Sequence, residues 1–261
     1  MPAQQQAVNV SCDNMRQTLI FISTLICLTS CNSTEVTERH SNGKPKEERT
    51  YFNKDSSDFK IVQYYPSGQK SFEGNVINNL FVGQKINYFE KGKIKQIDSL
   101  YKPCALDFCC CDGVVKRFRE SGILLETFIN KGGVENGLVF TYDTLGKLES
   151  KYEMFNGHKN GKAEKYFDNG TLAFKAHFQN DTIKGYALYF YGNGDTLKMM
   201  KYNGNNMDFP YYKWLKNGQI IKGEVINNGN QILWTWMDKN RNILKTTKAK
   251  FATEITVPED Q

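Results

Sequence analysis

The chain has 261 residues, of which 34 are Lys or Arg and 28 are Asp or Glu, so its formal net charge is +6. The basic residues form short groups at 91–95, 116–119 and 245–250, which is typical of a solvated sheet face; attraction to an anionic lipid or polymer stays open. The three histidines (His40, His158 and His177) are scattered, and the sequence contains no phosphate-binding loop. The scattered histidines and the missing phosphate-binding loop argue against an enzyme and a bound cofactor. A nucleic-acid partner is disfavoured because the leader described next predicts a location in the cell envelope.

The first expected element is a bacterial signal peptide over residues 1–31. An apolar run at 19–28 follows Arg16; it is too short to span a bilayer, which takes about 20 residues, but it fits a signal-peptide core. The run ends in Leu28-Thr29-Ser30-Cys31, which resembles a lipobox, so Cys31 is the expected lipidation site. Each buried methylene of an acyl chain contributes ~0.8 kcal/mol, so two or three chains would anchor the protein to a membrane. A buried segment or a plain secretory leader is the alternative.

The residues on either side of this leader refine the expectation. Residues 1–14 do not fit a leader, which indicates that Met15 is the true start. Asn32 rather than Asp follows Cys31, which favours the outer over the inner membrane of the cell envelope. Residues 32–58 are polar and have few apolar side chains, so they are predicted to be a flexible tether.

After the tether, a glycine returns every 24 residues, apart from one interval of 30. These repeat glycines are Gly68, Gly92, Gly122, Gly146, Gly170, Gly194 and Gly218. A period of this length predicts stacked copies of one small structural unit. An aromatic residue precedes each glycine by four positions, namely Tyr64, Tyr88, Phe118, Tyr142, Tyr166, Phe190 and Trp214.

Each copy is predicted to be a β-hairpin with its glycine in the turn, because glycine adopts positive φ without steric cost. Apolar residues alternate along the arms, as in Leu172, Phe174 and Ala176, and Arg241 takes the glycine position of a last, degenerate copy. We therefore expect an all-β, elongated, single-layer antiparallel sheet of about eight hairpins over 59–248, roughly 75 Å long, with a tail at 249–261. The aromatic column is predicted to be its core, with a ligand-stacking groove as the alternative.

The repeat resembles the MORN-repeat families, and more closely their bacterial variant. The shared element is aromatic-x-x-x-Gly-x-Leu, as in Tyr142 to Leu148 and Tyr166 to Leu172, and the resemblance covers about residues 60–248. It implies an elongated hairpin solenoid without catalytic residues, links to membranes and protein scaffolds, and, for many bacterial members, the label of an antitoxin. The expected function is binding or scaffolding of an unidentified protein partner, with neutralisation of a toxin as the alternative.

Four cysteines mark the single place where the repeat is lengthened. Cys104, Cys109, Cys110 and Cys111 all lie in an insertion at 102–112. In an oxidising envelope they predict one or two disulfides, and the pairing stays open. A metal site is less favoured because consecutive cysteines project in different directions. A redox-active pair is the remaining possibility, which would make the chain a thiol-active protein at this loop.

Overall fold

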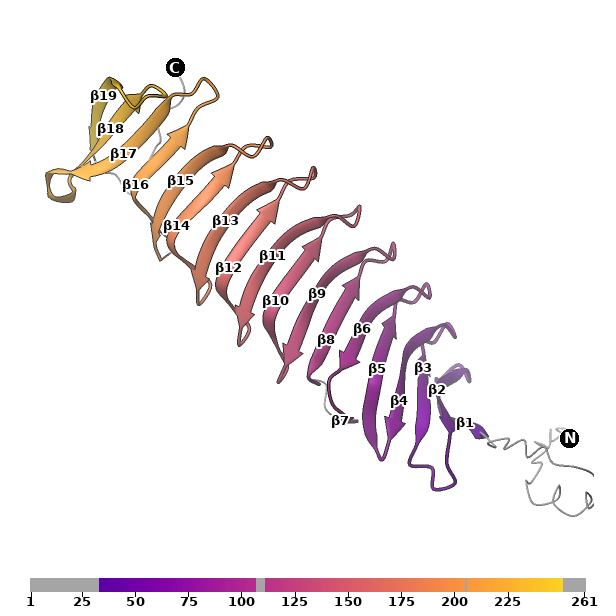
Figure 1. Cartoon of the computed structure of the whole chain (residues 1–261). Helices are drawn as coiled ribbons and strands as arrows, with labels where there is room; N and C mark the ends of the chain where they lie inside the picture. Colours follow the sequence, from indigo (N-terminus) through magenta and orange to yellow (C-terminus); the bar gives the residue numbers. More distant parts are fainter. Residues whose placement is uncertain (1–32, 107–110, 205, 251–261) are drawn as a thin grey trace, which may run out of the picture.

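A computed structural model describes residues 33–106, 111–204 and 206–250, and it has the form of one long, curved antiparallel sheet (Figure 1). Successive hairpins stack in chain order, so the first and the last described strand lie at opposite ends of the sheet. The described residues contain no α-helix, and one 3₁₀ turn at Asn227–Gly229 interrupts the strands. The predicted all-β class and the single elongated sheet of hairpins are confirmed.

The first ten strands follow one another from the N-terminal end. They are β1 (Ser33–Arg39), β2 (Pro45–Tyr51), β3 (Phe59–Tyr64), β4 (Lys70–Ile77), β5 (Leu80–Tyr88), β6 (Ile94–Leu100), β7 (Cys104–Ala105), β8 (Gly113–Phe118), β9 (Leu124–Lys131) and β10 (Val134–Tyr142). The other nine are β11 (Leu148–Phe155), β12 (His158–Tyr166), β13 (Leu172–Gln179), β14 (Thr182–Phe190), β15 (Thr196–Asn203), β16 (Asn206–Trp214), β17 (Ile220–Ile226), β18 (Gln231–Met237) and β19 (Ile243–Lys250). The short β7 stands aside from the ladder, because β6 pairs directly with β8.

One five-residue turn closes every repeat hairpin. In the hairpin of β3 and β4, the Tyr65 N–H donates to the Gln69 carbonyl at 2.8 Å, and the Gly68 N–H donates to the Tyr65 carbonyl at 2.8 Å. The seven predicted turn glycines all have φ between 81° and 95°, a region that side-chain-bearing residues rarely adopt. Arg241 adopts φ 69° at the same place in the turn between β18 and β19, as the sequence predicts.

The predicted flexible tether at 32–58 is wrong for most of its length. β1 and β2 form a further hairpin, and β2 pairs with β3. Gly43 closes its turn with φ 82°, 25 residues before Gly68. The polar composition was misleading because a single-layer sheet leaves both faces partly open to water, so an end hairpin needs few apolar side chains. The sheet therefore has nine repeat hairpins rather than eight, and β19 extends to Lys250, beyond the predicted start of the tail.

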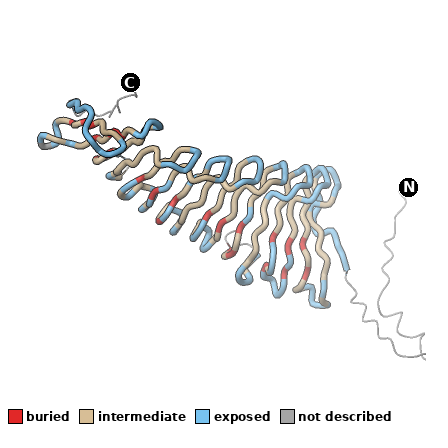
Figure 2. The backbone as a smooth tube through the Cα atoms, turned by 45° about the horizontal axis from the view of Figure 1, so that its top comes forward, coloured by how far each residue is buried: buried red, intermediate tan, exposed pale blue. Residues whose placement is uncertain are grey.

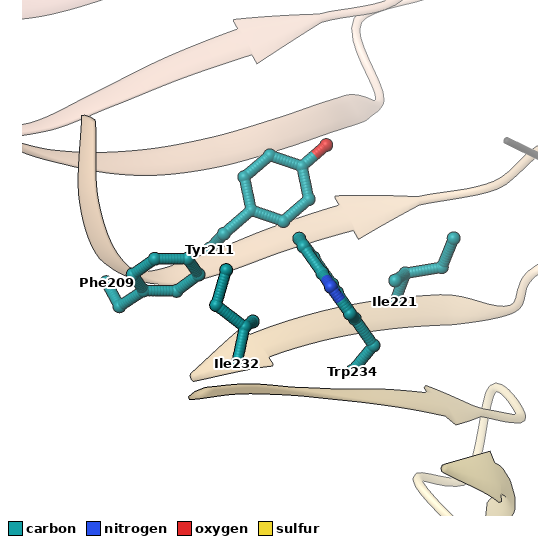
Figure 3. Packing of buried hydrophobic residues seen from close by; sticks show 5 residues of the cluster. All are labelled: Phe209, Tyr211, Ile221, Ile232 and Trp234. Atoms are coloured by element: carbon teal, nitrogen blue, oxygen red, sulfur yellow. The ribbon is translucent and has the colours of Figure 1, made fainter. Parts of the chain in front are cut away.

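Most buried side chains lie on one face of the sheet, which we call the core face; Ile220 and Thr235 are buried on the opposite face. Seven of them form a row that follows the repeat period, with exposed fractions of 0–9 %: Ile61, Lys85, Val115, Val139, Ala163, Ala187 and Tyr211. Buried positions recur in the same place from strand to strand (Figure 2). The most populated cluster lies near the C-terminal end, where Trp234 packs edge-on against Tyr211 with ring centroids 5.7 Å apart (Figure 3).

The predicted core aromatics lie on the opposite face. Each of these aromatics follows a residue of the buried row by three positions. Because successive side chains of a strand point to opposite faces, an odd spacing places the aromatic on the other face. All seven are half-buried and none belongs to the buried set, so the prediction that this column forms the core is wrong. The physical reason is that the described sheet is a single layer, so a side chain is buried only where the curvature of the sheet brings side chains of neighbouring strands over it, and these rings lie on the other face.

Candidate binding surfaces

Two predicted columns of the repeat meet on the face opposite the core face, which we call the open face. The strand register places each aromatic opposite the residue two positions after its turn glycine, as in Tyr88 with Ile94, Tyr142 with Leu148, and Trp214 with Ile220. Repeated along the sheet, these cross-strand pairs form a band that we call the aromatic–aliphatic stripe. Lys70 and Thr196 take the aliphatic position in two hairpins, as the sequence indicates. The stripe reaches from β3 to β17, and most of its members are half-buried, whereas Lys70 and Ile94 are exposed and Ile220 is buried.

Hydrogen bonds between neighbouring turns hold the stripe in place. The residue after an aromatic of the stripe can reach the backbone carbonyl of the next aromatic along the sheet. Tyr65 Oη donates to the Tyr88 carbonyl at 2.7 Å, and Tyr191 Oη donates to the Trp214 carbonyl at 2.9 Å. Because these bonds join successive hairpins, they fix the spacing of the rings as well as the spacing of the turns.

The N-terminal part of the stripe is polar, and its side chains are joined by a hydrogen bond and an ion pair. Tyr88 Oη donates to Glu73 Oε1 at 2.5 Å, and Lys60 Nζ lies 2.9 Å from Glu73 Oε2. Burial and this hydrogen bond raise the pKa of Tyr88 to about 12. Burial alone would raise the pKa of Glu73, but the hydrogen bonds from Tyr88, Lys60 and Lys70 outweigh it and hold that pKa at about 2. The phenol therefore stays neutral and the carboxylate stays charged over the whole physiological range, so this pair acts as a structural clasp.

The C-terminal part of the stripe is apolar and hollowed. An open hollow of about 440 Å³ lies over β14 to β18, and its lining is mainly aromatic and thioether side chains with two cations at its border. The lining residues are Tyr186, Met199, Pro210, Tyr212, Trp214, Ile220, Lys222, Met237 and Arg241. Tyr212 stacks on Trp214 with ring centroids 5.9 Å apart, and Tyr186 is 44 % exposed. This hollow can accept a flat or branched apolar group more readily than any polar part of the stripe.

The sequence pointed to the stripe but did not single out the hollow. Tyr186 and Met199 carry no repeat signal of their own, because each sits outside the aromatic-x-x-x-Gly-x-Leu element, whereas Met237 takes the aromatic position of the degenerate copy that has Arg241 in the glycine position. The available clue for Tyr186 was its even spacing from Phe190 on the same strand, which places both on one face. Met199 lies three positions after Thr196, and only the register shift between Tyr189 and Phe190 brings it to that face.

The cysteine insertion folds against the core face. Cys104 and Cys111 form a disulfide with Cα atoms 5.7 Å apart, and β7 pairs with the start of β5. Lys85 Nζ, almost fully buried, contacts Cys111 Sγ at 3.8 Å. Cys109 and Cys110 lie outside the described residues, so their pairing stays a prediction. Within the described residues no group of three or more His, Cys, Asp or Glu side chains is placed to hold a metal ion.

The predicted basic groups are only partly available for an anionic partner. Lys91 pairs with Glu120 at 3.3 Å, and Arg117 pairs with Glu126 at 2.8 Å. Lys245 and Lys248 lie on the last strand, β19. Cys31 precedes the described residues, and in the described ranges we find no helix with the length and apolarity needed to cross a bilayer.

A comparison with protein families identifies one of these hairpins. Residues 159–180 match the family described as MORN repeat variant, and they span most of β12, the Gly170 turn and β13. Comparison with curated proteins gives no match for this chain. MORN repeats are generally binding or scaffolding modules rather than catalytic ones. Because the other hairpins repeat the turn and the register of the matched one, the fold and the family match together support a MORN-repeat protein.

Proposed function

We propose that this chain is a lipid-anchored, non-catalytic binding protein of the cell envelope, which holds a protein partner against the aromatic–aliphatic stripe. The observation that carries this proposal is the half-exposed stripe itself, which runs in register across the sheet and ends in the hollow at Trp214. Contiguous apolar surface of this kind, bordered by polar residues, is characteristic of interaction sites on soluble proteins.

The composition of the hollow favours a protein over a lipid or a polymer as the occupant. Aromatic rings and arginine dominate the binding energy of protein interfaces, and Tyr186, Trp214 and Arg241 combine them around one depression. Met199 and Met237 add flexible side chains that adapt to the shape of a partner. We expect a partner that inserts an apolar side chain here and places an acidic group near Arg241, since Lys222 already pairs with Glu224.

A crosslinking experiment tests this assignment in the intact chain. A photoreactive amino acid is placed at Tyr186 in the hollow or, as the matched control, at Lys165, which is exposed on the core face. After irradiation of the native cells, position 186 should give one dominant protein adduct that position 165 does not give. Equal adduct patterns at both positions, or only lipid adducts at position 186, would contradict the proposal.

The proposed anchor is tested separately. Because β1 begins at Ser33, a lipid on Cys31 would hold the first strand close to the bilayer, without the long tether that the sequence predicted. Growth with a labelled fatty acid should label the unsubstituted chain, and Cys31→Ala should remove both the label and the membrane association. Retention of the label in that variant would place the lipid elsewhere or refute the anchor.

The two other hypotheses gain no specific support. The stripe has no feature that would select a toxin as the partner, so the antitoxin role remains a prediction. In the same way, two of the four loop cysteines form a disulfide, and a thiol activity would rest on Cys109 and Cys110.

A further inference from the structure

Within the described residues, the sheet is open at both ends. Among the described strands, β1 pairs only with β2, and β19 pairs only with β18. All of β1 is exposed, and so is all of β19 apart from Ala249. The outer edge of such a strand presents unpaired backbone N–H and C=O groups, which can bind one further strand.

The two edges have complementary directions. Neighbouring strands run antiparallel throughout, and the nine repeat hairpins contribute an even number of strands, because β7 stands aside from the ladder. β1 and β19 therefore run in opposite directions. A second copy that is shifted along the sheet, without being turned over, brings its β1 antiparallel to β19 of the first copy, with the two core faces on the same side.

The strand register agrees with this arrangement. The buried row of the core face belongs to a longer line of cross-strand neighbours. This line begins at Glu35, which pairs with Arg49, and it ends with Trp234 paired with Thr247. If this line continues into a second copy, Glu35 of the second copy lies beside Thr247 of the first. Lys245 then lies diagonally across from Glu35, within reach of a cross-strand ion pair.

The charges of the two edge strands favour a contact between β19 and β1 over a contact between two identical edges. β19 carries Lys245, Lys248 and Lys250 and no acidic residue, whereas β1 carries Glu35 and Glu38 against a single Arg39. Two β19 strands would repel each other, and two β1 strands would bring four acidic residues together with only two arginines to offset them. A contact between unlike edges also leaves one free edge on each copy, so it can repeat without closing.

We propose that copies of this chain associate head to tail, with β19 of one copy paired with β1 of the next, so that the sheet continues from molecule to molecule. The proposal is independent of the function assigned to the stripe. A single strand pair buries much less than the ~1,600 Å² of a standard interface, so the association is weak and depends on local concentration and salt.

Paired cysteines test the predicted register in the full-length chain. If Glu35 lies beside Thr247, then Val36 lies beside Thr246, and directly opposed Cβ atoms about 4.5–5.5 Å apart are close to disulfide distance. Under mild oxidation in cells, Val36→Cys combined with Thr246→Cys should give a ladder of dimers, trimers and longer species. Each single variant gives the background from the native cysteines. The matched control combines Thr246→Cys with Lys162→Cys, since Lys162 is exposed on the central strand β12.

The outcomes separate the possible arrangements. A ladder from the Val36/Thr246 pair alone supports head-to-tail pairing. Dimers from Val36→Cys by itself would indicate a symmetric β1 contact and overturn the proposal. The absence of a ladder, or an equal ladder from the Lys162 control, would overturn it as well.

A charge exchange provides a second test that does not depend on the choice of cysteines. Lys245→Glu should lower the ladder yield about fivefold, because it replaces the diagonal attraction between Lys245 and Glu35 by a repulsion, a change of about 1 kcal/mol. Adding Glu35→Lys should restore the yield, because the edges are then complementary in the reverse sense. Failure of this restoration in a variant that still folds would refute pairing between β1 and β19.

Discussion

Two tryptophans on opposite faces allow a direct test of which face holds the sheet together. Trp234 is 2 % exposed on the core face and packs against Phe209 and Tyr211 (Figure 3), whereas Trp214 is half-buried in the stripe. Trp234→Ala should cost about 3–5 kcal/mol, because it removes a fully buried ring and leaves a cavity. Trp214→Ala should cost less, roughly 1–2 kcal/mol, because this ring is only partly buried and borders an open hollow, so its removal leaves no enclosed cavity.

The measurement must resolve single repeats, since the stability of a repeat array is approximately a sum over repeats and their nearest-neighbour contacts. Hydrogen exchange followed by mass spectrometry meets this need. Trp234→Ala should raise exchange across β16 to β19 and leave β8 to β12 protected, whereas Trp214→Ala should leave both regions protected but lose the adduct at position 186. Equal loss of protection in the two variants would refute the distinction between the core face and the stripe.

Three further perturbations address the turns, the clasp and the packing at one glycine. Arg241→Gly should raise the denaturation midpoint and Gly170→Ala should lower it, by about 1 kcal/mol each, because both positions have positive φ and an added Cβ at Gly170 meets no atom within 4 Å; opposite signs would refute the turn argument. Glu73, with its pKa lowered to about 2, contributes stability that is fully present above its unfolded value of about 4.5 and is lost as the pH falls toward 2. Glu73→Gln should therefore make the free energy of unfolding depend less on pH over that range, as measured by circular dichroism. An unchanged acid transition would contradict this role. A Cβ on Gly223 would lie 2.6 Å from Trp234 Cζ3, so Gly223→Ala should destabilise the unsubstituted chain but have little effect beside Trp234→Ala, and additive losses would contradict the contact.

The sequence predicted the parts of this structure that depend on local backbone geometry. A turn glycine must adopt positive φ wherever the chain reverses, so the position of Gly170 in the sequence is enough to locate its turn. The aromatic and aliphatic columns could likewise be expected to meet, because both flank the same turn. The first hairpin was missed because the interval from Gly43 to Gly68 is 25 residues rather than 24, and because its polar strands resemble a tether.

The choice of the buried face could not be made from residue types. Large aromatics such as Tyr64 and Trp214 suggested the core, whereas the buried row contains alanines and even Lys85. In a layered protein, a second element covers whichever face carries the large apolar residues. In a single sheet, the side chains of neighbouring strands must cover one another, so burial depends on the curvature and twist of the sheet more than on the size of any one residue.

The buried row of the core face also indicates what sets the spacing between successive hairpins. Its members range from Ala163 and Ala187 to Tyr211, so the volume packed between neighbouring hairpins differs greatly along the sheet. The turn hydrogen bonds and the cross-strand register nevertheless recur with little change from one hairpin to the next. If side-chain packing fixed the spacing, these differences in volume would disturb it; the backbone ladder and the turns must therefore fix it. That arrangement leaves the open face free to vary, which is why one scaffold can carry a polar clasp at Glu73 and an apolar hollow at Trp214.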